Sequence, residues 1–207
     1  MISCMVQMLT IITPYYYDNR IHNMGNNGPM GLLHATLAPI FTKIIDEKAY
    51  GRRNIRAEIY NSIESESIVD LCCGVGFSTK NGMTGIDTSD EMIKFANFYN
   101  PNREYINGNS EDFGEDNQFD VVTCMFAFHE MPNDAHRKIV DNAIRISKKQ
   151  VIIVDISTNY KPSNLMLSGE PYILNYLDTI DKILHNFNKK TLIPNHVDCW
   201  TFNHYVK

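Results

Sequence analysis

The sequence predicts an α/β fold in which a doubly wound, mostly parallel sheet follows an N-terminal helical preface. From Ser67 onward, short apolar runs alternate with segments of helical periodicity, a pattern typical of parallel strands joined by right-handed crossovers. The length of 207 residues and the hydrophobic fraction of 43% suit one domain with a sizeable core. Open sheets of this kind bind ligands at the carboxyl ends of their strands. The residues that end each apolar run are therefore the first candidates for a functional site.

Residues 1–63 are predicted to form an arm and helices that act as a lid or cap on the core of residues 64–207. The opening MISCMVQMLTII lacks the positive charges of a signal peptide and is interpreted as a buried strand or short helix. Residues 14–31 are rich in Tyr, Asn, Gly and other helix breakers, so we expect a loop or mobile arm. Residues 32–63 carry apolar side chains at helical spacing, with one interruption near Gly51.

Five strands and two helices are predicted in the first part of the core. The strands are IVDLCC (68–73), MTGID (83–87), EYIN (104–107), FDVVTCMFAF (119–128) and QVIIVDIS (150–157), and the helices cover 89–99 and 134–147. After a loop at 157–169, a helix over 170–186 precedes TLIPNHVDCWTF (191–202). This last segment is expected to supply a closing pair of strands.

Composition and charge disfavour several classes of function. The net charge of -5 leaves no global basic surface for a phosphate backbone, so nucleic acid is a disfavoured partner. No segment approaches the length of a membrane helix, which predicts a soluble protein. The cysteines are odd in number and irregularly spaced, which indicates reduced buried thiols and a cytoplasmic location. They are Cys4, Cys72, Cys73, Cys124 and Cys199.

The stretch SIVDLCCGVGFSTKNGMTGID (67–87) joins the first two predicted strands and holds the densest set of candidate site residues. It contains no phosphate-binding loop of the GxxxxGK[ST] type. A zinc site is disfavoured because Cys72 and Cys73 are adjacent and no second pair lies at ligand spacing. No metal is therefore expected.

Gly74 and Gly76 form a G-x-G turn that also occurs in dinucleotide fingerprints. Two details argue against a dinucleotide. Thr79 replaces the third glycine, and Asp70 would sit close to a pyrophosphate, whereas its carboxylate suits a cofactor that carries an ammonium group. Asp87, which ends the second strand, can accept hydrogen bonds from two adjacent hydroxyls such as those of a ribose.

These motifs resemble those of class I S-adenosylmethionine-dependent methyltransferases, and the resemblance extends through about residue 200. VDLCCGVGFST is similar to motif I of the family, GIDTSDEMI to the element around the end of the second strand, and NGNSEDF to the adenine-edge motif. FDVVTCMFAFHEMP resembles the fourth-strand motif of a small-molecule subgroup with FHELP-like sequence, and GEPYILNYL and LIPNHVDCW resemble its C-terminal half. The resemblance implies a Rossmann-like, seven-stranded sheet with one antiparallel strand.

The resemblance also implies a binding site for S-adenosylmethionine. It places Asp70 near the methionine amino end, Asp87 on the ribose hydroxyls and Met92 beside the adenine. The predicted cofactor-binding residues are Asp70, Cys72, Gly74, Gly76, Asp87, Thr88, Met92, Asn109, Ser110, Cys124 and Met125. Structural alternatives remain open, since Asp87 could cap the next helix, Asp70 could bind a backbone amide, and Met92 could belong to the core.

Two departures from the family pattern concern the first turn. A glycine is usual at position 72, so Cys72 is tolerable only if its backbone has ordinary dihedral angles. Only ten residues separate Gly76 from Asp87, which shortens the expected first crossover helix to one or two turns.

His129 is the candidate base or substrate-orienting residue, because it follows the fourth strand where the methyl group of the cofactor is expected. A hydroxyl or acidic carbon needs such a base; the alternative is a histidine that bonds the backbone of the turn. Glu130 is interpreted as structural. HEMPN is not the zinc motif HExxH, because the second histidine is missing and Pro132 would disrupt the helix. Asn133 with Asp134 is interpreted as the cap of the next helix.

Tyrosines of the N-terminal arm are candidates for an aromatic lid, since aromatic faces favour a sulfonium cation; partial surface packing is the alternative. The predicted substrate-binding residues are Tyr16, Tyr17, His129 and Tyr172, with Tyr15, His22, Asn23 and His34 as further pocket candidates. FAFHEMP is not the [DNS]PP[FYW] signature of methyltransferases that act on nucleic-acid bases. With the acidic net charge, this favours a small-molecule acceptor.

The expected function is methyl transfer from S-adenosylmethionine to a small molecule. A catalytically silent protein that binds S-adenosylmethionine and acts as a regulatory partner is the first alternative, because binding residues alone do not establish turnover. An NAD(P)-dependent oxidoreductase is the second. It is disfavoured because the third glycine and a Tyr-x-x-x-Lys pair on a later helix are missing.

Overall fold

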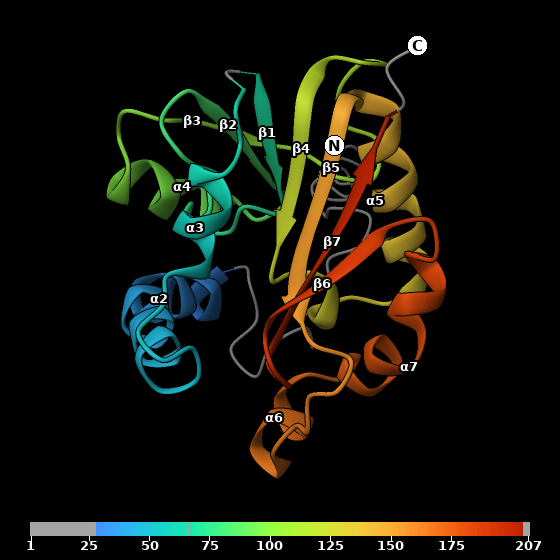
Figure 1. Cartoon of the computed structure of the whole chain (residues 1–207). Helices are drawn as coiled ribbons and strands as arrows, with labels where there is room; N and C mark the ends of the chain where they lie inside the picture. Colours follow the sequence, from blue (N-terminus) through green and yellow to red (C-terminus); the bar gives the residue numbers. More distant parts are fainter. Residues whose placement is uncertain (1–27, 66, 205–207) are drawn as a thin grey trace, which may run out of the picture.

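Seven strands form one sheet in the order β3-β2-β1-β4-β5-β7-β6 (Figure 1). The computed structural model describes residues 28–65 and 67–204. The strands are β1 (Ile68–Leu71), β2 (Met83–Asp87), β3 (Glu104–Asn107), β4 (Phe119–Met125), β5 (Ser147–Ile156), β6 (Asn188–Ile193) and β7 (Val197–Asn203). In this order the neighbouring strands β3, β2, β1, β4 and β5 pair in parallel. Strand β7 pairs antiparallel with both β5 and β6. The predicted sheet and its closing pair of strands are confirmed.

Helices lie on both sides of this sheet. They are α2 (Gly28–Lys48), α3 (Ile55–Asn61), α4 (Asp90–Tyr99), the 3-10 turn η1 (Phe128–Glu130), α5 (Asn133–Ile146), α6 (Asn164–Gly169) and α7 (Ile173–Ile183). In Figure 1, α5 and α7 lie on one side of the central strands, and α2, α3 and α4 lie on the other. Within the described part of the chain, no helix is both long and apolar enough to cross a membrane.

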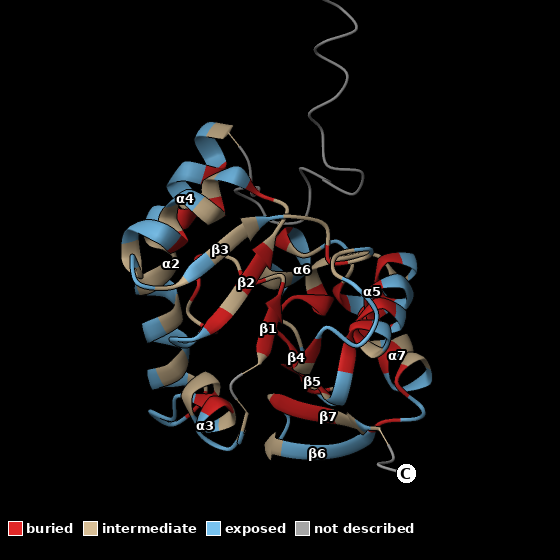
Figure 2. Cartoon of the chain, turned by 90° about the horizontal axis from the view of Figure 1, so that it is seen from above, coloured by how far each residue is buried: buried red, intermediate tan, exposed pale blue. Residues whose placement is uncertain are grey.

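The core is divided between the two faces of the sheet by the alternation of strand side chains. In β5, Val151 and Ile153 pack in the cluster that includes α5 and α7, whereas Ile152 and Val154 pack in the cluster that includes Tyr50 and α3. Figure 2 shows the central strands largely buried and much of the outer helical surface exposed. Burial on both faces explains why these strands are near-continuous apolar runs.

Within the helical preface, α2 packs on the sheet domain through α4. Ala35 of α2 meets Met92 of α4 and Val75 of the turn after β1 in a small apolar cluster. The hydroxyl of Tyr99 also donates to the carbonyls of Ala35 and Thr36. These contacts hold α2 beside the turn after β1, which contains the G-x-G motif.

Two predicted loops are partly helical. The last residues of the predicted arm belong to α2, which begins at Gly28. Pro29 is tolerated in the first turn because its missing N–H would have no helical partner there, and Gly31 is buried in the helix. Within the predicted loop at 157–169, α6 forms a short helix.

The predicted cap of α5 is wrong. Pro132 occupies the N-cap position, and Asn133 is already the first helical residue. The side chain of Asn133 instead donates to Asn175 and accepts from Thr179, both on α7. The side chain of Asn133, which the local sequence predicts to cap α5, therefore bonds α7 instead.

Candidate functional site

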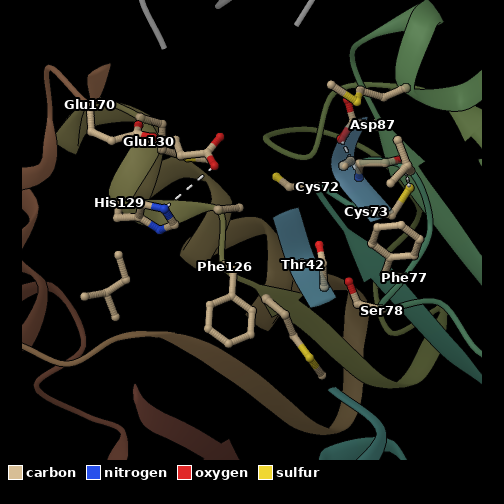
Figure 3. A pocket seen from close by; sticks show the side chains of 18 of the residues that line it. Thr42, Cys72, Cys73, Phe77, Ser78, Asp87, Phe126, His129, Glu130 and Glu170 are labelled. Atoms are coloured by element: carbon tan, nitrogen blue, oxygen red, sulfur yellow. Dashed lines mark hydrogen bonds and ion pairs between the residues drawn. The ribbon is translucent and has the colours of Figure 1, made fainter. Parts of the chain in front are cut away.

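A cavity of about 650 Å³ lies at the carboxyl edge of the sheet. Its wall combines the turns after β1, β2 and β4 with residues that follow β5 and with part of α2. Figure 3 shows two groups of side chains across this cavity. Asp87 and the turn after β1 lie on one side, and His129, Glu130 and Glu170 lie on the other.

Asp87 holds the turn after β1. One carboxylate oxygen accepts from the backbone N–H of Gly74 at 2.9 Å, and the other accepts from that of Ser89, also at 2.9 Å. Ser89, not Asp87, is the N-cap of α4, because its hydroxyl accepts from the backbone N–H of Met92. Since an ionised carboxylate has about four acceptor positions, Asp87 keeps capacity for further donors. Burial raises the pKa of Asp87, and the bonds from the amides of Ser89 and Gly74 oppose that rise.

The backbone of this turn leaves room for a ligand at Gly74. Gly74 has a φ of 53°, and a Cβ built on it would meet no atom within 4 Å. Cys72 also has a positive φ, 56°, so the condition of ordinary dihedral angles at this position fails. The backbone N–H of Cys72 donates to the Ser110 hydroxyl at 3.3 Å, which joins the turn to the segment after β3.

Turns, not a helix, connect β1 to β2, so the expected short crossover helix is wrong. Residues 72–82 must run back along β1 before β2 begins, which leaves too little chain for helix and turns together. Gly76 donates to the Cys73 carbonyl, and its own carbonyl accepts from Thr79 and from the Arg103 side chain. A Cβ on Gly76 would collide with the Tyr105 ring. Gly76 is therefore required by packing.

Asp70 is fully buried behind this turn and is not part of the cavity wall. The hydroxyls of Thr79, Thr123 and Tyr60 donate to its carboxylate at 2.8, 3.0 and 3.4 Å. Burial raises the pKa of Asp70 to about 6, and the hydroxyl bonds oppose this rise. Asp70 ties the turn to β4 and α3, and this geometry does not support its predicted contact with the amino end of a cofactor.

The predicted cofactor residues are mostly brought together. Those in the cavity wall are Cys72, Gly74, Asp87, Thr88, Met92, Asn109, Ser110 and Met125. Asp70, Gly76 and Cys124 lie outside the wall, because Asp70 bonds inner hydroxyls, Gly76 packs on Tyr105, and Cys124 points into the core of the α5 face. Met92 is both a core residue and a wall residue.

Only some of the predicted substrate-binding and pocket residues line the cavity. His129 and His34 line the cavity. Tyr172 does not, since it precedes α7 at its N-cap. Tyr15, Tyr16, Tyr17, His22 and Asn23, together with Cys4 and the opening segment, lie outside the described residues.

His129 forms a buried pair with Asp155, the acid near the end of β5. The two side chains meet at 2.6 Å between Nδ1 and Oδ1. Asp155 also accepts from the backbone N–H groups of Phe128, His129 and Ile156, so the carboxylate fixes the turn that carries the imidazole. Tyr176 packs edge-on against the ring of His129. The other ring nitrogen, Nε2, lies 3.7 Å from a Glu130 carboxylate oxygen.

The charges around His129 favour the protonated imidazole. Burial alone lowers its pKa, but the carboxylate of Asp155 and, to a smaller extent, those of Glu130 and Glu170 outweigh burial and raise the pKa to about 9. The neutral form that can accept a proton is therefore a minor species at pH 7, and its population grows as the pH rises toward 9.

The turn that carries His129 is strained at its start. Phe126, directly after β4, has a φ of 57°. Its ring stacks on Tyr50 at 5.9 Å between centroids, and the Arg56 guanidinium lies 4.3 Å from its centre. The contacts of the ring offset a backbone conformation that costs about 1–3 kcal/mol.

Sequence reasoning missed Asp155, Glu170 and Arg56, which lie at or beside the cavity. A signal existed for Asp155, since it sits in QVIIVDIS much as Asp70 sits in IVDLCC. Glu170 follows a short helix in a predicted loop, and no spacing in the sequence marks it as a partner of His129.

The cavity fits the cationic cofactor that the sequence resemblance implies. Its described wall contains four carboxylates, from Asp87, Glu111, Glu130 and Glu170, against the guanidinium of Arg56 and the protonated imidazole of His129. This balance suits a sulfonium and an ammonium group, and it opposes the pyrophosphate of a dinucleotide. Open space at Gly74 and spare acceptor capacity on Asp87 match a ribose-bearing ligand.

Comparison with known proteins agrees with this geometry. Residues 68–150 match the family model described as a methyltransferase domain. An uncharacterised methyltransferase of Synechocystis is 34% identical over 109 residues, which are 48% of this chain and 50% of that protein. The ubiquinone biosynthesis O-methyltransferase of Rickettsia bellii is 26% identical over 185 residues, which are 84% of this chain and 72% of that protein.

A solved structure shows the same fold at low sequence identity. The magnesium protoporphyrin IX methyltransferase of Synechocystis, crystallised with bound S-adenosylmethionine, has a TM-score of 0.59 at 12% identity. The match covers 93% of this chain and 100% of that structure. The chain therefore has the fold of this S-adenosylmethionine-binding structure, and the segment from β1 to the start of β5 matches a methyltransferase domain.

Proposed function

We propose that the protein transfers a methyl group from S-adenosylmethionine to a hydroxyl oxygen of a small molecule. The observation that carries the proposal is one cavity with Asp87 on one side and the His129–Asp155 pair on the other. The choice of oxygen is supported by relatives such as the Rickettsia protein, which is named an O-methyltransferase. A small acceptor and the absence of nucleic acid agree with the acidic net charge.

In this proposal the turn after β1 binds the cofactor. The cofactor supplies an electrophilic methyl group on a sulfonium. Asp87 accepts the ribose hydroxyls with positions that its bonds to Gly74 and Ser89 leave available. The backbone at Gly74 permits close approach, and Met92 with Ser110 and Asn109 borders the base.

His129 is the proposed base. Its Nδ1 is held by Asp155, so Nε2 is the nitrogen that can receive the hydroxyl proton of the acceptor. Because the pKa of His129 is raised to about 9, the imidazole must first lose its proton, and transfer should become faster between pH 7 and 9. Burial of the pair limits competing water.

The cap and the location are further parts of this proposal. The cap of residues 1–63 stays a proposal, and its described part supports it because His34, Thr42 and Ile45 of α2 line the cavity. The free, mostly buried thiols among the described cysteines favour the cytoplasm.

Two measurements on the purified chain test the function. Calorimetry with S-adenosylmethionine, S-adenosylhomocysteine and NADPH should show binding of the two adenosyl ligands alone. Incubation with methyl-labelled S-adenosylmethionine and a panel of phenols, catechols and amines should label a hydroxyl-bearing compound. A folded protein that binds neither adenosyl ligand would contradict the proposal. Binding without transfer to any acceptor in metabolite extracts would favour the catalytically silent partner.

A further inference from the structure

We infer that His129, Glu130 and Glu170 form a binding site for a first-row divalent cation of the Mn²⁺ type at the acceptor side of the cavity. The three residues each offer one ligand atom, and these atoms lie within 4.8 Å of one another. Figure 3 shows the three side chains grouped together, away from Asp87 and the turn after β1. The inference adds a site to the proposed methyltransferase and does not depend on methyl transfer.

The separations suit a shared ion. Ligand atoms that bind one metal at about 2.0–2.3 Å lie about 3 Å apart when adjacent and up to about 4.5 Å apart when opposite. Nε2 of His129 and the nearer oxygen of Glu130 are 3.7 Å apart, which is longer than a hydrogen bond. An ion between them requires only small side-chain rotations.

The surroundings of His129 match those of a metal-bound histidine. This distinguishes the cluster of His129, Glu130 and Glu170 from an ordinary surface cluster of acids. His129 is 8% exposed, and its Nδ1 is held at 2.6 Å by Asp155. A carboxylate on one ring nitrogen fixes the tautomer and directs the other nitrogen toward a ligand, as around metal-bound histidines. The three amides that bond Asp155 hold this arrangement.

The chemistry of the donors selects the class of ion. One imidazole and two carboxylates suit Mn²⁺, Fe²⁺ or Zn²⁺, whereas Mg²⁺ prefers oxygen ligands alone. The spacing of the cysteines predicts no metal site, and no thiol takes part here. HExxH is also not involved, because the third ligand comes from the segment after α6, far along the chain.

An ion at this site would change the task of His129. Its Nε2 lone pair would bind the cation, so metal-bound and proton-accepting His129 are alternative states. The cation would then bind the acceptor oxygen and lower the pKa of its hydroxyl, whose proton leaves to water. Three protein ligands leave positions for such an oxygen.

Mn²⁺ titration of the full chain, followed by the loss of the electron paramagnetic resonance signal of free Mn²⁺, tests the site. We expect one equivalent to bind, with affinity at least tenfold lower in Glu130→Gln and in Glu170→Gln. Glu111→Gln is the matched control, since Glu111 lines the same cavity but pairs with Lys138 at 3.6 Å. Mn²⁺ is the probe because thiolates compete for it poorly.

Three results would overturn the site. They are no Mn²⁺ binding by the unmodified chain, unchanged affinity in both glutamine variants, or an equal loss in Glu111→Gln, which would indicate diffuse attraction to acids. Because no cofactor or acceptor is present in the titration, its outcome is independent of the methyl-transfer assay. Failure of one proposal therefore leaves the other separately testable.

Discussion

The turn after β1 and the turn after β4 stand side by side at the carboxyl edge, yet they present different chemistry to the cavity. Both begin with a non-glycine residue at positive φ, Cys72 at 56° and Phe126 at 57°. The turn after β1 presents mainly backbone groups to the cavity. Asp70, the acid of β1, is buried behind this turn and accepts hydrogen bonds from the hydroxyls of Thr79 and Thr123. The turn after β4 presents titratable side chains, and the acid that supports it, Asp155, comes from β5.

This difference indicates that the two turns have different functions. Backbone groups and neutral side chains can hold a cofactor without changing protonation, so the first turn suits binding over a wide pH range. The second turn places His129 among carboxylates that raise its pKa, which suits proton transfer or metal binding. Variants in the two turns should therefore affect different measured quantities.

The largest effect is expected from His129→Ala. Loss of the proposed base should lower turnover by about 100-fold, within the range for general base catalysis, and change affinity for S-adenosylmethionine by less than about threefold. Steady-state methyl transfer and calorimetry give the two numbers. His185→Ala, an exposed histidine after α7, is the control. Equal losses of turnover and affinity would make the histidine a structural part of the turn.

Asp87→Ala should give the opposite pattern. It removes an acceptor of charge-assisted hydrogen bonds and releases the Gly74 amide, so affinity for S-adenosylmethionine should fall at least tenfold. Asp90→Ala, an exposed acid on α4, should bind normally in the same calorimetric titration. Unchanged affinity in the Asp87 variant would remove this residue from the ribose role.

Asp155→Asn tests whether the negative charge of Asp155 sets the pKa of His129 in the turn after β4. The carboxylate raises the pKa of His129, so its loss should move the midpoint of the pH–rate profile from about 9 toward the ordinary histidine value near 6.5. Weaker orientation of the ring should lower the maximal rate by about tenfold. Asp178→Asn, exposed on α7, should leave the profile in place. A profile that stays near pH 9 in Asp155→Asn would argue against this pair.

The smallest effect concerns the two strained residues. Cys72→Gly should raise the free energy of unfolding by about 0.5–1 kcal/mol, because glycine adopts positive φ without the usual cost. Phe126→Gly relieves similar strain but loses the contacts with Tyr50 and Arg56, so we expect a net loss of about 2 kcal/mol. Urea denaturation measures both. A gain in both variants would mean that the Phe126 ring adds little.

The fold was largely predictable because its signals are local. Alternating apolar runs predict the strands, and seven of them form the sheet with β7 antiparallel. The predictions that failed, the crossover helix and the Asn133 cap, depended on how much chain a parallel return requires and on a side chain that α7 captures. The ten residues between Gly76 and Asp87 already indicated a short connection, whereas the α7 partners of Asn133 lie far along the chain and cannot be read from neighbouring residues.

The sequence by itself determined which residues stand at the ends of the strands, since the period of the apolar pattern and the glycines of the turn are properties of short segments. Only the tertiary structure decided what each of those residues faces. Asp70 and Asp155 occupy similar places in similar strands, but Asp70 meets the hydroxyls of Thr79 and Thr123, whereas Asp155 meets His129. A carboxylate takes its role from the donors that neighbouring strands and turns bring to it, and those donors lie far away along the chain.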